Sequence, residues 1–380
     1  MDLHPSMGGK SLLFNNIVVS TTAFLIVFAT TPLVRKYALR WKLGDKPNGR
    51  KVHTCLIPHL GGIGMVLGVI GALVVYRFFL MPEPPKELFF LWRILPGVVL
   101  IVLLGLVDDM MSLKVFQKLV VQILAALLVV AAGFNLLVGI PFIDQIALVP
   151  LLFTVVYLVA ISSAVNLIDG HDGLAGGICF ISASAFACIS SMLGATSLLA
   201  ISIALGASCL AFLAYNFPPG KIFMGDTGSM FLGLVLGLIA CSLSLLRPGI
   251  TTFFGVCFVI GVPIMDALLA IARRMSFRMP VFNADALHMH HVLGSFGLSP
   301  KQTLFILYSV QTVLAVLGFF AVKGFVFPVI IGCAFFVVMC LLFFRLMIAA
   351  GRQEREEADA LTRDSIPALE NEAIASKSSH

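Results

Sequence analysis

The chain is built from a series of long apolar runs, many of them near the length of about 20 residues that a helix needs to cross the hydrocarbon of a bilayer. These runs are continuously apolar, whereas the strands of a transmembrane barrel alternate apolar and polar residues. Of the 380 residues, 59% are hydrophobic and 12% are charged, but water-soluble domains carry about 25% charged residues. We therefore predict an all-α polytopic membrane protein with about eleven transmembrane helices.

The charges of the loops predict the orientation of the chain. The first apolar run, residues 14–33, is too long for a cleavable signal and is predicted to be the first transmembrane helix. Positive residues gather in cytoplasmic loops, and the loop after this run is the densest basic segment, with Arg35, Lys36, Arg40, Lys42, Lys46, Arg50 and Lys51. We therefore expect the N-terminus outside and the C-terminus in the cytoplasm. Because the net charge of +6 resides largely in such loops, we expect no nucleic-acid partner.

The apolar runs also predict the domain organisation. Residues 1–347 are predicted to form a single transmembrane domain, and residues 348–380 a polar cytoplasmic tail, rich in Glu and Arg, that extends the last helix. Within the domain, the run over residues 251–272 is predicted to be one continuous helix, and a long inner loop over residues 273–302 follows it.

A polar insert, N-L-I-D-G-H-D-G-L at residues 166–174, interrupts the apolar pattern. Its glycines allow a tight turn, so Asp169 and Asp172 are presented from a loop where a new helix begins. Other loops on the predicted inner side carry similar groups: Asp108 and Asp109, then Asn216 and Asp226, and finally Asp285 with His288, His290 and His291. A transporter would more often hold its ionisable residues near the bilayer midplane. These loops therefore predict a site at the cytoplasmic face.

The chemistry of this face favours phosphate together with a divalent cation. Helices predicted over residues 174–193 and 229–246 begin there, and the positive ends of their dipoles favour an anion. The clustered carboxylates would repel that anion unless a cation lies between them, and hard oxygen ligands favour Mg²⁺, with Mn²⁺ as an alternative. We therefore predict metal-assisted phosphoryl transfer.

Each acidic residue also has a structural interpretation. Asp172 and Asp226 stand just before helices and could be N-caps. Asp108 and Asp109 could be a solvated pair, because adjacent residues point about 100° apart on a helix. Asp266 lies two turns before a pair of arginines, which favours an ion pair or another structural polar contact.

The aromatic and imidazole groups likewise leave alternatives open. The histidines of H-M-H-H at residues 288–291 could bind zinc, remain solvated, or contact a substrate phosphate or sugar, although no convincing thiolate lies nearby. Phe223 could anchor the membrane interface or stack on a nucleotide base.

Taken together, these motifs resemble the polyprenyl-phosphate N-acetylhexosamine-1-phosphate transferases over nearly the whole membrane domain. The motifs, in order, are K-P-N-G-R-K-V-H with I-P-H-L-G-G at 46–62, L-V-D-D at 106–109, N-L-I-D-G-H-D-G-L at 166–174, N-F-P-P-G-K-I-F-M-G-D-T-G-S at 216–229 and H-M-H-H at 288–291. The spaced histidines resemble the WecA and TagO branch more than the continuous histidine run of the MraY type.

The resemblance implies a bacterial inner-membrane enzyme that starts a cell-envelope polysaccharide, such as lipopolysaccharide or teichoic acid. It would transfer N-acetylhexosamine-1-phosphate, with GlcNAc-1-phosphate favoured, from a UDP-amino sugar to undecaprenyl phosphate or another polyprenyl phosphate, and UMP would leave. A UDP-muramoyl-peptide transferase of the MraY type is the alternative, and a transporter or flippase is the alternative from another class. A homodimer is left open.

The resemblance also implies roles for individual residues. The catalytic set is Asp108, Asp109 and Asp169, Mg²⁺ is held by Asn166 and Asp226, and the substrate-binding set is Lys118, Asp172, Asn216, Phe223, His288, His290 and His291. Two positions depart from the family pattern. Many relatives have Arg directly after the Asp that precedes the histidine segment, whereas here Ala286 follows Asp285. Many relatives also have Arg at the position of His59.

Overall fold

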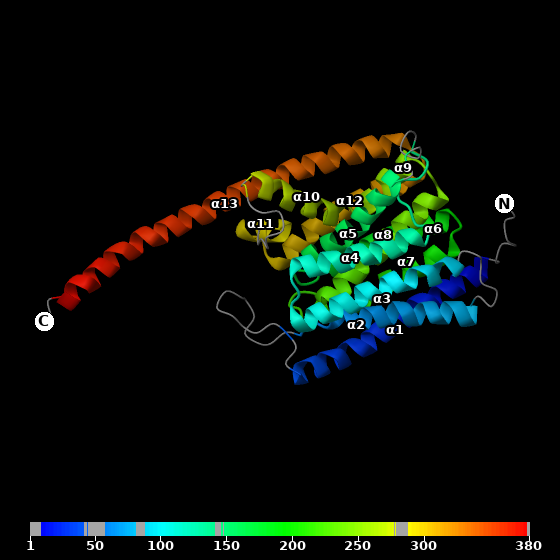
Figure 1. Ribbon diagram of the computed structural model, residues 1–380, viewed down its shortest axis with the longest axis horizontal. Coiled ribbons are helices and arrows are strands. Elements are labelled where there is room, and N and C mark those ends of the chain that lie inside the picture. The colour runs from blue at the N-terminus through cyan, green and yellow to red at the C-terminus, as the bar shows by residue number, and fades with distance from the viewer. Residues whose placement is uncertain are drawn as a thin grey trace.

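A computed structural model of the protein describes residues 9–41, 44, 58–80, 88–140, 146, 148–276, 278 and 288–377. In this part of the chain every regular element is a helix (Figure 1), which confirms the all-α prediction. The elements are α1 (Gly9–Arg40), α2 (Gly61–Val75) with its continuation η1 (Tyr76–Leu80), α3 (Leu88–Met111), α4 (Val115–Ala131), α5 (Leu148–Ile168), α6 (Leu174–Met192), α7 (Thr196–Asn216), α8 (Gly225–Leu246), α9 (Ile250–Val259), α10 (Gly261–Ser276), α11 (Met289–Ser295), α12 (Pro300–Val322) and α13 (Val326–Lys377).

The helices have the length and composition of a polytopic membrane protein. Among the described residues, nine are long and apolar enough to cross a bilayer, or ten if the bent pair α9 and α10 counts as one span. The helix α4, with 17 residues, is apolar but shorter. Large apolar side chains such as those of Leu67, Phe79 and Val156 lie exposed on the outer faces, where lipid would cover them.

The centre of the bundle is α8. In its most apolar window 83% of the residues are buried, against 11% in the corresponding window of α13. A helix that is apolar all round belongs in the interior, and α8 packs against α2, α3 and α5. The first turn of α8 therefore lies where the ends of several other helices meet.

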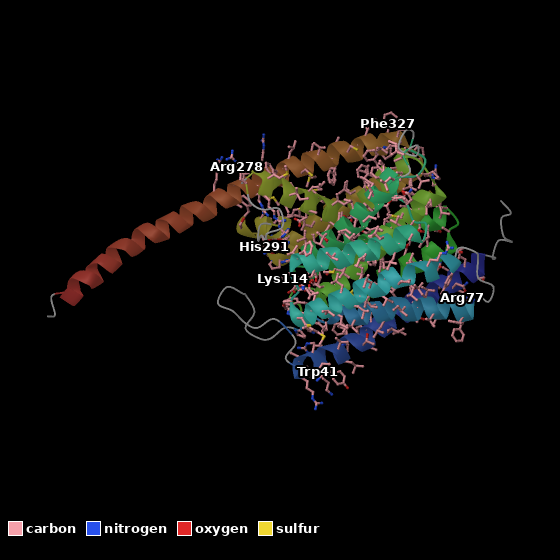
Figure 2. The ribbon with its side chains drawn as sticks, viewed as in Figure 1. Trp41, Arg77, Lys114, Arg278, His291 and Phe327 are labelled. Atoms are coloured by element: carbon pink, nitrogen blue, oxygen red, sulfur yellow. The ribbon has the colours of Figure 1, made fainter. Side chains whose placement is uncertain are left out.

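Successive helices run in opposite directions, which brings the loops that carry the polar motifs to one end of the bundle (Figure 1). Trp41 after α1, Lys114 before α4 and His291 of α11 lie at this end, whereas Arg77 and Phe327 lie at the opposite end (Figure 2). We call the first of these the motif end, because Asp108, Asp169 and Asp226 lie on the helix ends gathered there.

The continuous helix predicted over residues 251–272 is wrong, because α9 and α10 meet at an angle of 84°. Gln311 of α12 stabilises the break. Its side-chain oxygen accepts a hydrogen bond from the N–H of Val262 at 2.9 Å, and its nitrogen donates to the carbonyl of Val259 at 2.6 Å. Backbone groups freed in an apolar environment must find partners inside the protein, and the fully buried amide of Gln311 supplies them.

Two elements complete the motif end. The short helix α11 lies inside the inner loop predicted over residues 273–302 and carries the histidines. The last helix, α13, runs without interruption through residue 347 and extends away from the bundle (Figure 1). The division into a domain and a tail at residue 347 stays a prediction.

Candidate active site

The acidic region of the motif end consists of Asp108, Asp109, Lys118, Asn166 and Asp226. Its centre is an ammonium group between two carboxylates: Nζ of Lys118 donates to Oδ2 of Asp226 at 2.6 Å and also contacts Oδ2 of Asp108. Lys118 comes from α4, Asp108 from α3 and Asp226 from α8. Segments far apart in the sequence thus place two negative charges around one positive charge.

Asp109 caps the N-terminus of α8. Its carboxylate accepts hydrogen bonds from the backbone N–H of Asp226 at 2.7 Å, from the backbone N–H of Thr227 at 3.1 Å and from the Thr227 hydroxyl at 2.6 Å. The first N–H groups of a helix have no partner within the helix, and a negative charge there also stabilises the helix dipole. The alternative in which Asp226 is itself the N-cap is therefore wrong.

The close approach of α3 to α8 depends on Gly105. A Cβ atom at this position would lie 2.5 Å from the nitrogen of Thr227 and 2.7 Å from the carbonyl oxygen of Asp226, so a side chain would push the helices apart. The missing side chain lets Asp109, one turn later on α3, reach the first turn of α8.

The two adjacent aspartates therefore have different surroundings. Asp108 accepts a hydrogen bond from the N–H of Leu113 at 2.6 Å with one oxygen and contacts Lys118 with the other. Asp108 is 6% exposed, so the alternative of a solvated pair is wrong. Asp108 faces the charged centre, and Asp109 faces the backbone of α8.

Asn166, at the end of α5, orients Asp226. Its side-chain nitrogen donates to Oδ1 of Asp226 at 2.9 Å and to the hydroxyl of Ser229 at 2.9 Å. Ser229 in turn donates to the carbonyl of Gly225 at 2.9 Å, which ties the network to the first turn of α8. The amide thus holds a carboxylate in this arrangement, and its role as a metal ligand stays a prediction.

Asp169 follows α5 and lies within electrostatic reach of the acidic region. Burial of its carboxyl group raises its pKa well above the ordinary value, and the nearby charges of Asp226 and Asp109 raise it further. A hydrogen bond from the backbone N–H of Gly225 opposes this shift. The geometry brings Asp169 beside the predicted catalytic pair.

The acidic region suits a divalent cation in its chemistry. The carboxylates of Asp108 and Asp226 are hard oxygen donors, and in this structure they already converge on one cationic group, the ammonium of Lys118. Within the described ranges, no group of three or more His, Cys, Asp or Glu residues could hold a metal ion by itself. Magnesium is typically bound by one or two carboxylates plus substrate phosphates rather than by a complete protein cage, so this donor set fits Mg²⁺.

Beside the acidic region, the loops after α5 and α7 are joined by Asn216 and Asp172. Asn216 accepts a hydrogen bond from the N–H of Gly173 at 2.8 Å and donates to the carbonyl of Ile222 at 2.9 Å. Oδ2 of Asp172 accepts from the N–H of Gly220 at 2.8 Å. The alternative in which Asp172 caps α6 is wrong, because its carboxylate bonds the other loop and Gly173 occupies the N-cap position.

Asp172 differs from Asn216 in one respect. Its second oxygen, Oδ1, is buried and has no hydrogen-bond partner among the residues that the structure describes. Asn216 uses both ends of its amide within the protein. Of this pair, Asp172 therefore offers an acceptor to a ligand, and Asn216 holds the two loops together.

Phe223 is paired with His59. Their rings are stacked, with centroids 5.8 Å apart and an interplanar angle of 24°. The backbone supports the pair, because the N–H of Phe223 donates to the carbonyl of Pro58 at 2.8 Å and its carbonyl accepts from Gly61 at 3.0 Å. Sequence reasoning singled out both residues but did not connect them.

The histidine region consists of Asp266, His171, His288, His290 and His291. Asp266 of α10 organises it: one carboxylate oxygen lies 2.7 Å from Nδ1 of His288, and the other accepts from the N–H of Met289 at 2.8 Å. Asp266 is thus a buried structural contact, as its sequence context suggested, and it bonds the histidine segment. These two contacts orient the His288 ring and hold the start of α11.

The other imidazoles pack on this anchor. The rings of His290 and His291 have centroids 4.1 Å apart, and those of His290 and His288 are 6.1 Å apart with nearly parallel planes. His290 is 5% exposed. Burial, together with the neighbouring imidazoles, lowers the pKa of His290 to about 2, so its ring is neutral.

Sequence reasoning missed His171, whose ring centroid lies 5.5 Å from that of His290. Its position between Asp169 and Asp172, inside the polar insert, was the available signal. Asp285 and Ala286 lie outside the described residues, as do Lys42, Lys46, Arg50 and Lys51 of the basic loop.

Comparison with known proteins identifies similar sequences and a matching family. Residues 91–244 match the glycosyl transferase family 4. The chain is 33% identical over 341 residues, 88% of this chain and 91% of the relative, to a Bacillus subtilis protein named "Probable undecaprenyl-phosphate N-acetylglucosaminyl 1-phosphate transferase". It is 34% identical over 326 residues, 77% of this chain and 78% of the relative, to the decaprenyl-phosphate N-acetylglucosaminephosphotransferase of Mycobacterium tuberculosis.

A more distant relative has the same kind of name. The undecaprenyl-phosphate alpha-N-acetylglucosaminyl 1-phosphate transferase of Escherichia coli K12 is 27% identical over 319 residues, 80% of this chain and 85% of the relative. The family match over residues 91–244 includes Asp108, Asn166 and Asp226 of the acidic region. The chain therefore belongs to the glycosyl transferase family 4, in the group of polyprenyl-phosphate N-acetylhexosamine-1-phosphate transferases.

Proposed function

We propose that this protein transfers GlcNAc-1-phosphate from UDP-GlcNAc to a polyprenyl phosphate such as undecaprenyl phosphate, with release of UMP. The names of its relatives support a polyprenyl phosphate as the acceptor and GlcNAc-1-phosphate as the transferred group. The observation that carries the proposal is the meeting of Asp108 and Asp226 around one cation at the N-terminus of α8. Two carboxylates and one ammonium group beside a helix N-terminus can together bind a diphosphate and its metal ion.

The proposal includes a topology. Counting α4 as a span and the bent pair α9 and α10 as another makes eleven crossings, with the N-terminus and the motif end on opposite sides. Positive residues favour the cytoplasm, and Arg35 and Arg40 lie on the α1 end that meets the motif end. The site then faces the cytoplasm of a bacterial inner membrane, where nucleotide sugars are available, and the lipid substrate arrives from the bilayer.

The reaction is a substitution at phosphorus. An oxygen of the lipid phosphate forms a bond to the β-phosphorus of the UDP-sugar, the bond from that phosphorus to the oxygen bridging to the α-phosphate breaks, and UMP leaves with the electron pair. A phosphate is already anionic near pH 7, so the nucleophile needs no general base. Positioning and charge neutralisation are therefore the main tasks of the protein.

Asp108, Lys118 and Asp226 perform these tasks. Asn166 and Asp226 would hold Mg²⁺, which would supply neutralisation of the charge that develops on the phosphate oxygens. Lys118 contacts both carboxylates and offsets part of their negative charge before substrate enters. Its ammonium group can then donate to a phosphate oxygen. Asp109 keeps the first turn of α8, and thereby Asp226, in place.

The uridine portion is assigned to the loops next to the acidic region. The unpaired Oδ1 of Asp172 can accept a hydrogen bond from the N–H of uracil. The Phe223 ring, one face of which stacks on His59, can stack on the base with its other face. Asn216 holds the two loops at the distance that this arrangement needs.

The proposal is tested by UMP release from radiolabelled UDP-GlcNAc with purified protein, undecaprenyl phosphate and Mg²⁺. UDP-GalNAc and a UDP-muramoyl peptide are compared in parallel, and reactions without lipid and with a chelator are the controls. Release that requires both lipid and metal supports the transferase. Preference for the muramoyl peptide would change the substrate, and no turnover of any nucleotide sugar would reject the function.

A further inference from the structure

His171 is the histidine of the histidine region for which the family resemblance implies no role. It lies in the turn between α5 and α6, whereas His290 belongs to α11, far along the chain. The two rings nevertheless lie 5.5 Å apart between centroids, at an angle of 35°. The fold thus brings the polar insert of residues 166–174 against the histidine segment.

Both imidazoles have an unsatisfied nitrogen. Nε2 of His171 and Nε2 of His290 are buried and have no hydrogen-bond partner within the described part of the chain, and His290 as a residue is 5% exposed. Leaving a buried polar atom unpaired is costly. Two such atoms on neighbouring rings therefore indicate a ligand that bonds them.

Gly170 lies directly against the edge of the His290 ring that carries Nε2. A Cβ atom at this position would lie 3.2 Å from Nε2 and 3.3 Å from Cε1 of His290, which is tighter than an ordinary van der Waals contact. Because glycine has no side chain, the turn can approach this edge of the imidazole closely. A larger residue at position 170 would press on Nε2 and displace the ring.

The surroundings favour a phosphate oxygen over a metal ion. The helix α6 begins at Leu174, just after this turn, and the positive end of its dipole favours an anion. His290 is neutral and can donate one N–H. Among the described residues no group of three or more possible ligands could hold a metal ion.

We propose that His171 is a further substrate-binding residue, which together with His290 donates an Nε2–H to a phosphate oxygen of the sugar-1-phosphate portion of the donor. This inference rests on the proposed function and specifies which part of the UDP-sugar the histidine region contacts. The uridine would lie on the other side of the turn, where Asp172 bonds Gly220.

The test compares His171→Leu, which removes the imidazole, with His171→Gln, whose amide nitrogen can take the place of Nε2. We expect His171→Leu to raise KM for UDP-GlcNAc about fivefold to tenfold, the loss of one hydrogen bond, with kcat and KM for undecaprenyl phosphate nearly unchanged. His171→Gln should restore most of the donor KM. By calorimetry, binding of UMP should not change, whereas binding of UDP-GlcNAc should weaken.

A matched variant separates binding from a structural role. Tyr308 donates to the carbonyl of Gly173 at 2.5 Å, so Tyr308→Phe loosens the same turn and leaves the imidazoles in place. We expect it to lower the thermal midpoint in detergent without raising the donor KM. If His171→Leu instead behaves like Tyr308→Phe, or if Gln restores nothing, His171 is structural and the inference fails.

The remaining outcomes distinguish this inference from the proposed function. A rise in KM for undecaprenyl phosphate, with the donor KM unchanged, would assign the imidazoles to the lipid phosphate and reject the donor assignment. Wild-type turnover with an unchanged His171→Leu variant would reject the inference alone. Absence of wild-type turnover and of UDP-GlcNAc binding would reject the proposed function and this inference with it.

Discussion

The acidic region and the histidine region lie at the same end of the bundle but differ in how they are satisfied. In the acidic region, the carboxylates of Asp108, Asp109 and Asp226 all have partners from the protein. In the histidine region, Nε2 of His171 and Nε2 of His290 are buried without a partner among the described residues. The acidic region finds its hydrogen-bond and ionic partners within the chain, whereas the histidine region needs a ligand to pair its two nitrogens.

This difference predicts which step of the reaction each region affects. A cluster whose groups are paired within the protein can form during folding, and Lys118 can then release its carboxylates and contact the substrate. Changes there should therefore affect turnover most, and in the case of Asp109 stability too. A region with unpaired hydrogen-bond donors gains its partners from the substrate, so changes there should alter the binding or the orientation of the substrate. The following predictions test this division, from the largest expected effect to the smallest.

The largest effect is expected from Asp226→Asn. The substitution keeps the volume of the side chain but removes the charge on which Lys118, Asn166 and the proposed Mg²⁺ converge. We expect Mg²⁺-dependent turnover to fall about 10³-fold, with the thermal midpoint in detergent close to that of the wild type. Near-normal UMP release at saturating Mg²⁺ would remove Asp226 from the metal site.

The next prediction separates the roles of the adjacent residues Asp108 and Asp109. Asp109→Asn turns amide hydrogens toward the N–H groups of Asp226 and Thr227, so we expect the loss of a helix cap, about 1–2 kcal/mol of stability. Turnover should fall about a hundredfold, because Asp226 is displaced with its helix. Asp108→Asn should lower kcat at least as much with little change in the thermal midpoint, because the backbone partner of Asp108 is the N–H of Leu113 rather than the first turn of α8.

Thr227→Val is the matched control for the cap. It keeps the shape of the side chain but removes the hydroxyl that donates to Asp109 at 2.6 Å. We expect about 1 kcal/mol of destabilisation and a smaller loss of turnover than in Asp109→Asn. Equal destabilisation by Asp108→Asn and Asp109→Asn would show that the two carboxylates do not have separate roles.

These roles show how far the sequence could predict the structure. The apolar runs predicted an all-helical membrane bundle because hydrophobicity over about 20 residues is a local property. The bend between α9 and α10 could not be predicted in the same way, because the amide that stabilises it belongs to Gln311, 49 residues after Val262. An apolar run contains no local sign of a partner that far away.

The site shows the same limit. The motifs at Asp108, Asp109 and Asp226 could be recognised together, but their division of roles depends on the approach of α3 to α8, across 117 residues of sequence between Asp109 and Asp226. Asp266 was read only as a structural polar contact, because the pattern around it does not reveal that its partner is His288. Spacing identifies the residues, and packing decides which atom each one contacts.

A smaller effect is expected in the histidine region from Asp266→Asn. The carboxylate orients His288 and accepts the N–H of Met289, and a small misplacement of a substrate-binding group can lower the rate strongly. We expect kcat to fall about tenfold while binding of UMP is unchanged. An equal loss of UMP affinity would show that Asp266 supports the whole motif end rather than the histidine region.

The last prediction concerns the stability of the protein at low pH and leaves no trace near neutral pH. The pKa of His290 is about 2 in the folded protein, and an unfolded histidine has a pKa of about 6.5. Above pH 6.5 both states hold a neutral ring, so nothing changes. As the pH falls below 6.5, the unfolded chain takes up a proton that the folded protein does not, and stability is lost, by about 2 kcal/mol at pH 5. His290→Gln removes this proton uptake, so between pH 7.5 and pH 5 its thermal midpoint should fall less steeply than that of the wild type. Parallel slopes would mean that His290 is protonated in the folded protein, and the histidine region would then carry charge of its own, as the acidic region does.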